Sequence, residues 1–103
     1  MNQAEFVDNL QEDLEDLDIK ITKANLKEVV RQFNQLIAQT VANNDKVVFI
    51  GFGTYEPVDH KPRSGRNPKT GEHLEIPAKR VPKFAAGKDF KKLVADVSYD
   101  NLH

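Results

Sequence analysis

Apolar residues recur at helical spacing in two stretches of the first half of the chain. In the first stretch they are Phe6, Val7, Leu10, Leu14 and Leu17, which predicts an amphipathic helix over about residues 4–17. In the second they are Leu26, Val29, Val30, Phe33, Leu36, Ile37 and Val41, which predicts a second helix ending near residue 42. Thr22 is a suitable N-cap for this helix, and the Asn and Asp residues at 43–45 suit a left-handed cap or turn after it.

The pattern changes to that of β-strands after residue 45. The stretch "KVVFIGFGTYEPV" is rich in β-branched and aromatic residues, and Gly51 and Gly53 predict a tight connection between two strands. Residues 54–63 and 72–84 are predicted to be strands joined by a turn at 64–71. Four prolines punctuate them: Pro57, Pro62, Pro77 and Pro82. Because proline has no N–H to donate, we expect a two-stranded ribbon with open edges.

Helical spacing returns near the C-terminus. Phe90, Leu93, Val94 and Val97 predict a short helix over residues 87–97, and "SYDNLH" is predicted to be a frayed tail. The predicted class is therefore α+β. With 103 residues and 39% apolar content, the chain fits one small domain with a modest core, for which oligomerisation is a usual remedy. No apolar run reaches membrane-spanning length, and the acidic N-terminus is unlike a signal peptide.

Charge is distributed unevenly, although the formal net charge is only −1. Residues 1–19 contain seven acidic residues and no Lys or Arg, giving −7. Residues 61–92 contain ten Lys or Arg and three acidic residues, giving +7. A basic block in a nearly neutral chain indicates a localised anion-binding surface.

Catalytic chemistry finds little support in the sequence. His60, His73 and His103 lack the spacing of metal ligands, and cysteine is absent. The "GFG" stretch lacks the Lys-Ser/Thr of a phosphate-binding loop, and no nucleophile–base arrangement is evident. We therefore expect no enzyme activity, no cofactor, no metal and no small-molecule substrate.

Phosphate binding is better supported. On the return strand of the ribbon, Lys79 and Lys83 share a face and Arg80 lies on the other. Lys61 and Arg63, two residues apart, are predicted to share a face of the outgoing strand. The last helix begins with Lys88, and a helix N-terminus beside a lysine favours anions.

Three motifs carry a family resemblance: "GFGT" at 51–54, "GRNPKTGE" at 65–72 and "VPKFAAGKDFKK" at 81–92. With "MNQAEFVDNL" and "ITKANLKEVVRQF", the chain resembles the bacterial histone-like HU and integration host factor family, and is more similar to HU. The resemblance implies an intertwined homodimer. Residues 1–45 would form its helical base, 46–86 a short antiparallel saddle and a protruding DNA-binding arm, and 87–97 a C-terminal helix. It also implies a cytoplasmic, nucleoid-associated protein that bends double-stranded DNA, prefers bent or distorted DNA and has little sequence specificity.

The resemblance also implies roles for individual residues. Pro68 would intercalate at the arm tip, and Arg66 and Asn67 would enter the minor groove. The remaining DNA contacts would be Lys61, Arg63 and Lys69 along the arm, Lys79, Arg80 and Lys83 on the return strand, and Lys88 and Lys91 on the last helix. Phe52, Phe84 and Phe90 would belong to the dimer core.

Several features depart from the family pattern. The segment before Thr22 is about five residues longer than usual, and Pro57, Asp59, Glu72 and Glu75 make the arm less basic. The isoelectric point of about 6.3 is low for the family. Two alternatives therefore stand beside a sequence-independent DNA-bending protein. One is a protein-interaction module that keeps the dimer fold but binds DNA weakly or not at all. The other is sequence-specific bending, which needs a heterodimer or strong indirect readout.

Overall fold

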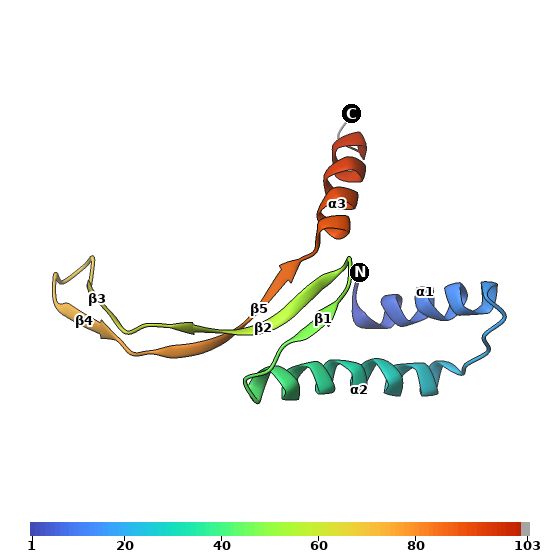
Figure 1. The fold of residues 1–103 in the computed structure, drawn as a ribbon, viewed down its shortest axis with the longest axis horizontal. Helices are drawn as coiled ribbons and strands as arrows, with labels where there is room; N and C mark the ends of the chain where they lie inside the picture. Colours follow the sequence, from blue (N-terminus) through green and yellow to red (C-terminus); the bar gives the residue numbers. More distant parts are fainter. Residues whose placement is uncertain (102–103) are drawn as a thin grey trace. The chain divides into compact units, whose positions relative to one another are not determined.

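The computed structural model describes the backbone of residues 1–101 and the side chains of residues 1–96. Its elements, labelled in Figure 1, are α1 (Gln3–Asp16), α2 (Lys23–Ala42), β1 (Val47–Phe49), β2 (Gly53–His60), β3 (Arg63–Arg66), β4 (His73–Ile76), β5 (Lys79–Ala86) and α3 (Lys88–Asn101). The predicted α+β class is confirmed. The chain forms two compact units, Met1–Ala38 and Gln39–His103, which are described separately.

Side-chain caps begin both helices of the N-terminal unit. The Asn2 side chain accepts a hydrogen bond from the Glu5 amide at 2.9 Å, so Asn2 is the N-cap of α1. The Thr22 hydroxyl accepts from the Asn25 amide at 3.1 Å, which confirms the predicted cap of α2. These bonds satisfy amides that have no partner within their own helix.

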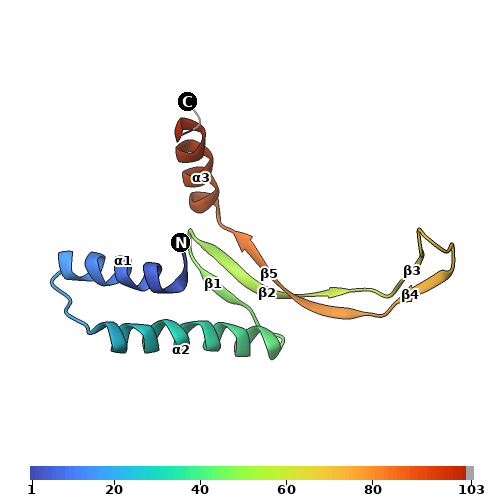
Figure 2. The same ribbon diagram turned by 180° about the vertical axis from the view of Figure 1, so that it is seen from behind.

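The two helices of this unit form a hairpin (Figures 1 and 2). Val7 of α1 is fully buried and Leu26 of α2 is 2% exposed. An ion pair of 2.5 Å joins Lys23 to Asp8, so the acidic charge of α1 is partly compensated at this point. Both partners remain about half exposed, and such a pair stabilises the fold only slightly.

Glycine allows the tight connection between β1 and β2. Gly51 has φ +80°, in the left-handed region, and the Phe52 amide donates back to the Phe49 carbonyl at 3.0 Å. A Cβ added at Gly53 would lie 2.4 Å from the Phe84 ring, so that site requires glycine for close packing. The predicted connection is confirmed.

The long ribbon keeps one register along its length. In β2 and β5 the pairs run from Gly53 opposite Ala86 to His60 opposite Lys79. In β3 and β4 they begin with Arg63 opposite Ile76. The same register places Pro62 opposite Pro77 in the gap between the two ladders. The prediction of two unbroken strands, 54–63 and 72–84, is therefore wrong, and the turn spans 67–72 because β3 continues to Arg66.

The alternation of hydrogen bonds explains why the ladder breaks there. Residues that lie opposite one another alternate between pairs that exchange two N–H···O bonds and pairs that exchange none. Pro57 lies opposite Pro82 inside the continuous ladder, and neither can donate, so theirs is a pair of the second kind. Pro62 is an odd number of positions further along, so the alternation of β2 and β5 would make Pro62 and Pro77 a pair that needs both missing N–H groups, and this ladder ends before them. The ladder of β3 and β4 has the other phase, because the Asn67 amide donates to the Glu72 carbonyl at the next level beyond it.

The ribbon has an open edge beyond β1. The sheet order is β1-β2-β5, and β1 pairs only with the three residues from Gly53 to Tyr55. Pro57 lies just past the end of β1, where its missing N–H would have had no strand partner. The expectation that the prolines lie on open edges is met at this position.

The last helix is longer than predicted. α3 continues to Asn101, beyond the expected end at residue 97, because no glycine or proline interrupts the sequence from Lys88 onward. The predicted frayed tail is therefore helical over 98–101. Residues 102–103, including His103, and the Val97 side chain lie outside the part of the chain that is described.

Candidate nucleic-acid interface

The tip of the ribbon is a loop organised by Asn67. Its amide donates to the Glu72 carbonyl at 2.9 Å, and its carbonyl accepts from the Gly71 amide at 2.7 Å. Its side-chain oxygen accepts from the Lys69 amide at 2.9 Å, which forms an Asx turn around Pro68. Asn67 is half-buried, whereas Pro68 is exposed. The loop therefore presents the proline ring outward on a fixed backbone.

Basic side chains flank this proline. Arg66 is the last residue of β3 and lies opposite His73, and both Arg66 and Lys69 are exposed. The Asn67 side chain was predicted to reach DNA, but its oxygen is engaged within the loop, which leaves its NH₂ group for a ligand. The structure thus adds a positioning role for Asn67 that the motif alone did not reveal.

The register separates the basic residues of β5 into two faces. Lys79 and Lys83 lie on one face, opposite His60 and Glu56 respectively. Arg80 lies on the other face, as predicted, and its Nε atom donates to Asp59 at 2.8 Å directly across the ribbon. The pair is substantially exposed, and it neutralises Arg80 locally.

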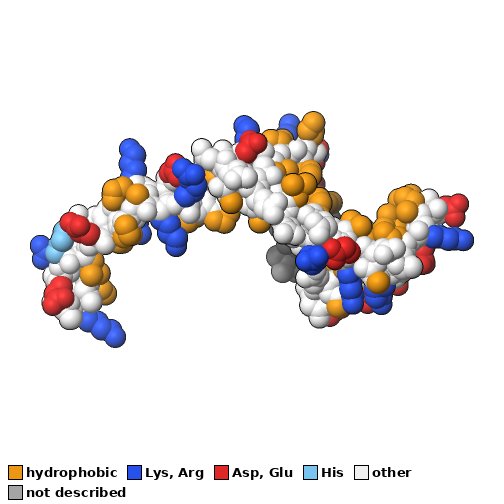
Figure 3. Space-filling model, turned by 90° about the horizontal axis from the view of Figure 1, so that it is seen from below, with side chains coloured by type: hydrophobic (Ala, Val, Ile, Leu, Met, Phe, Trp, Pro, Cys, Tyr) orange, Lys and Arg blue, Asp and Glu red, His pale blue; other side chains and the backbone are white. Residues whose placement is uncertain are grey.

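The remaining predicted arm residues do not form one surface with a regular spacing. Lys61 lies in the break between β2 and β3, whereas Arg63 begins β3 opposite Ile76. Both are exposed. The prediction that they share a face of one strand is therefore wrong, because the strand stops between them. Figure 3 shows Lys and Arg side chains spread along the ribbon, interspersed with acidic and apolar ones.

The N-terminus of α3 is partly occupied by the β1–β2 connection. The Phe90 amide donates to the Gly51 carbonyl at 3.2 Å, and the Gly87 amide donates to the Phe52 carbonyl at 2.7 Å. Lys88 and Lys91 are exposed on this helix. The predicted anion site therefore depends more on the lysine charges than on free helix amides.

An aromatic cluster joins α3 to the sheet. Phe52 stacks on Phe90 with ring centroids 4.8 Å apart, and Phe84 lies 5.6 Å from Phe52 and 4.7 Å from Tyr55. By the register, Tyr55 and Phe84 lie on the same ribbon face as Asp59 and Arg80. Lys79 and Lys83 therefore lie on the face that points away from the aromatic cluster.

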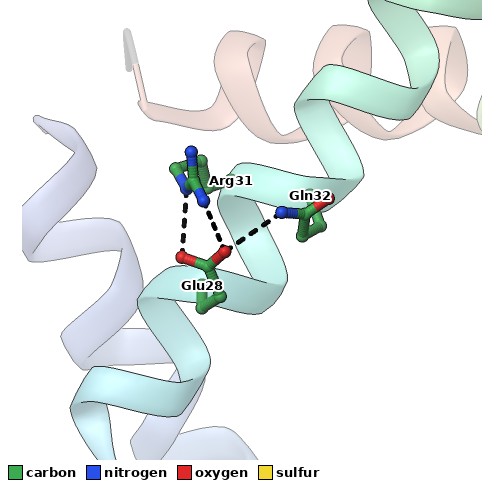
Figure 4. A network of polar contacts seen from close by, with 3 residues as sticks. All are labelled: Glu28, Arg31 and Gln32. Carbon is green, nitrogen blue, oxygen red and sulfur yellow. Dashed lines mark hydrogen bonds and ion pairs between the residues drawn. The ribbon is translucent and has the colours of Figure 1, made fainter.

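A network of three polar side chains lies on α2, outside the ribbon and α3. Arg31 donates two hydrogen bonds to Glu28, at 2.6 and 3.0 Å, and Gln32 donates a third at 3.0 Å (Figure 4). The hydrogen bonds of Arg31 and then Gln32 hold the pKa of Glu28 at about 2, below its ordinary value of 4.5. The same contact raises the pKa of Arg31. Because its side chains are exposed, this network is a surface contact of α2 and not a reactive site.

Metal and membrane sites were also sought among the described residues. They contain no group of three or more His, Cys, Asp or Glu side chains that could hold a metal ion. In the same part of the chain, no helix combines the length and apolar character needed to cross a membrane.

An exposed β-ribbon that carries more Lys and Arg than Asp and Glu side chains (Figure 3) suits binding to the phosphate backbone of a nucleic acid. The sequence profile of the family described as "Bacterial DNA-binding protein" matches residues 1–95. The chain is 43% identical to the DNA-binding protein HU of Nostoc sp. over 95 residues, which is 92% of this chain and 96% of the relative. It is also 43% identical to the HU of Synechocystis sp. over 96 residues, again covering 92% and 96%.

A solved structure agrees with these relatives. The chain resembles the HU in an Anabaena HU–DNA cocrystal structure with a TM-score of 0.80 and 43% identity, over 92% of this chain and 98% of that one. The chain therefore belongs to the bacterial DNA-binding protein family of HU and integration host factor. It is an HU-type, histone-like architectural DNA-binding protein, and the family is not one of enzymes.

Proposed function

We propose that two copies of this chain form a homodimer that bends double-stranded DNA by placing its two arms in the minor groove. In this proposal residues 1–45 form the base, residues 46–86 the saddle and arm, and the last helix completes the body. The dimer associates with the nucleoid and binds with little sequence specificity, preferring bent or distorted DNA.

Exposed apolar surface supports the dimer. The buried hydrophobic side chains among the described residues are Val7, Leu26 and Val41. By contrast, Phe52 is 48% exposed and Leu93 is 61% exposed. A soluble monomer rarely leaves large apolar patches open, and a second copy would cover them. The aromatic cluster of Phe52, Phe84 and Phe90 would then become part of a shared core.

The observation that carries the DNA mechanism is the fixed, exposed Pro68. A rigid apolar ring has little conformational freedom to lose when it enters a base step, and unstacking that step costs a few kcal/mol. The hydrogen bonds to Asn67 order the loop before DNA binds. Binding therefore adds little entropy cost for ordering the tip to the cost of unstacking the base step. Arg66 and Lys69 supply positive charge on either side, where a narrowed groove is most negative.

The other predicted contacts complete the proposed interface. We assign phosphate contacts to Lys61, Arg63, Lys79, Lys83, Lys88 and Lys91, all of which are exposed. Arg80 joins them only when it leaves Asp59. If about six phosphates are neutralised per dimer, log K should fall with log salt at a slope near −5.

Energy transfer between the labelled ends of a duplex tests the wedge. Pro68→Ala should reduce the bend angle at saturation more than it reduces affinity, because the phosphate contacts remain. Pro57→Ala, another arm proline, is the matched control and should leave the bend unchanged. An unchanged bend in Pro68→Ala would limit Pro68 to a turn residue. If duplex, nicked and bent DNA all fail to bind at low salt, the architectural proposal fails and the interaction-module alternative gains support.

A further inference from the structure

We infer that His60 and His73 are additional DNA-contacting residues of the arm, and that their charge makes DNA binding depend on pH. This inference rests on the proposed function and deepens it. Histidine is the side chain whose ordinary charge change falls between pH 5 and 8. The two histidines of the described chain both lie on the ribbon, and each lies directly opposite a permanent cation.

His60 lies on the face that points away from the aromatic cluster. Its partner across the ribbon is Lys79, and the next charged pair along that face is Glu56 opposite Lys83. His60 is exposed. On the opposite face, Asp59 is engaged by Arg80, so that carboxylate is already neutralised. A protonated His60 would extend the positive charge of Lys79.

His73 lies at the outer end of the ribbon. Arg66 is its partner on β3, and its Nε2 atom is 3.9 Å from the Glu75 carboxylate on its own strand. The His73 side chain is 61% exposed and that of Glu75 is 85% exposed. Glu72 precedes it in the loop, and its carbonyl accepts from the Asn67 amide. The imidazole therefore lies one strand away from the proposed minor-groove residue Arg66.

The phosphates of DNA couple protonation to DNA binding. A proton on either imidazole places a second cation at that level of the ribbon, beside Lys79 or Arg66. A phosphate that contacts this pair of cations favours the protonated form. The protonated arm therefore binds DNA more tightly, and the association constant rises as pH falls through the range in which histidine titrates. Each histidine that gains a phosphate contact should also steepen the salt slope by about 0.9.

The test compares wild type with the double variant H60Q/H73Q on one duplex at fixed salt, at pH 8 and pH 5.5. We expect the association constant of wild type to rise about tenfold at the lower pH, while that of the double variant changes less than about twofold. The two proteins should bind equally at pH 8. H103Q is the matched control, because it also removes one imidazole, and it should keep the wild-type rise. Calorimetry in two buffers with different ionisation enthalpies should show that wild type and H103Q take up protons when they bind DNA. The double variant should take up none.

Three results are informative. The inference is overturned if the association constant of H60Q/H73Q rises between pH 8 and pH 5.5 as much as that of wild type. It is also overturned if the association constant of wild type does not rise although wild type binds DNA at pH 8. In both cases the proposed function stands. Absence of DNA binding by wild type at pH 8 and low salt overturns both. Because both side chains are exposed, the variants should fold, and thermal unfolding at each pH verifies this.

Discussion

Replacing Pro62 with alanine returns an N–H group to the ribbon at the position where the ladder stops. When the alternation of β2 and β5 is continued to this level, the new N–H points across to the Pro77 carbonyl. Pro57→Ala is the matched control. Residue 57 belongs to the other kind of pair, so its new N–H points away from β5, and β1 ends before reaching it.

The expected magnitudes separate local from global effects. A restored hydrogen bond contributes about 0.5–1.5 kcal/mol net. Without the proline ring the unfolded chain has more conformational freedom, which lowers the free energy of unfolding by about 0.4–1 kcal/mol and opposes the gain from the hydrogen bond. The global free energy of unfolding should therefore change little for Pro62→Ala, whereas the new amide should exchange about two- to tenfold more slowly than an open one.

Amide hydrogen exchange followed by NMR is the assay. The amide of residue 62 in Pro62→Ala should be protected, and the amide of residue 57 in Pro57→Ala should exchange freely. Equal protection at both sites, or protection only at residue 57, would refute the assignment of the two proline pairs to opposite kinds of ladder position.

Three further outcomes are expected. Phe52→Ala should destabilise the protein by about 3 kcal/mol and make its thermal midpoint more dependent on concentration; a midpoint independent of concentration in wild type would contradict the dimer. Asp59→Asn should free Arg80 and tighten DNA binding about two- to fivefold at low salt, with no gain at high salt, as gel shifts across salt can show. The pKa of Glu28 is lowered from 4.5 to about 2, so the Arg31 contact stabilises the fold above pH 4.5 and that contribution is lost as pH falls towards 2. Urea midpoints of wild type and Glu28→Gln at pH 5 and 2.5 should therefore converge at the lower pH.

Features determined by nearby residues were predictable from the sequence. The Thr22 cap acts on an amide three residues away, and the left-handed Gly51 needs only the absence of a Cβ. The left-handed cap after α2 is likewise local, and Asn44 has φ +63° there. The ribbon also followed from composition, because several prolines exclude a central strand.

Features that depend on what lies across the ribbon were not predictable. The break at Pro62 requires knowing that Pro77 is its partner and that the alternation of β2 and β5 would make theirs a pair that exchanges bonds. The Asp59–Arg80 contact joins residues 21 positions apart, so no local spacing indicates it. Asn67 was recognised as a motif residue, but its role in holding the loop depends on the turn geometry.

A pair of opposing prolines occurs at two levels of the ribbon and has a different consequence at each. In pairs that exchange no bonds, both N–H groups point outward to the edges. Pro57 and Pro82 therefore remove one donor from each open edge at the same level, where another strand could otherwise attach, and they leave the ladder intact. In the alternation of β2 and β5, Pro62 and Pro77 would have to supply two inward donors that they lack, so this ladder ends before them. Since the two levels differ by an odd number of residues, one proline pair protects the stem of the arm, while the other separates that stem from the tip carrying Pro68.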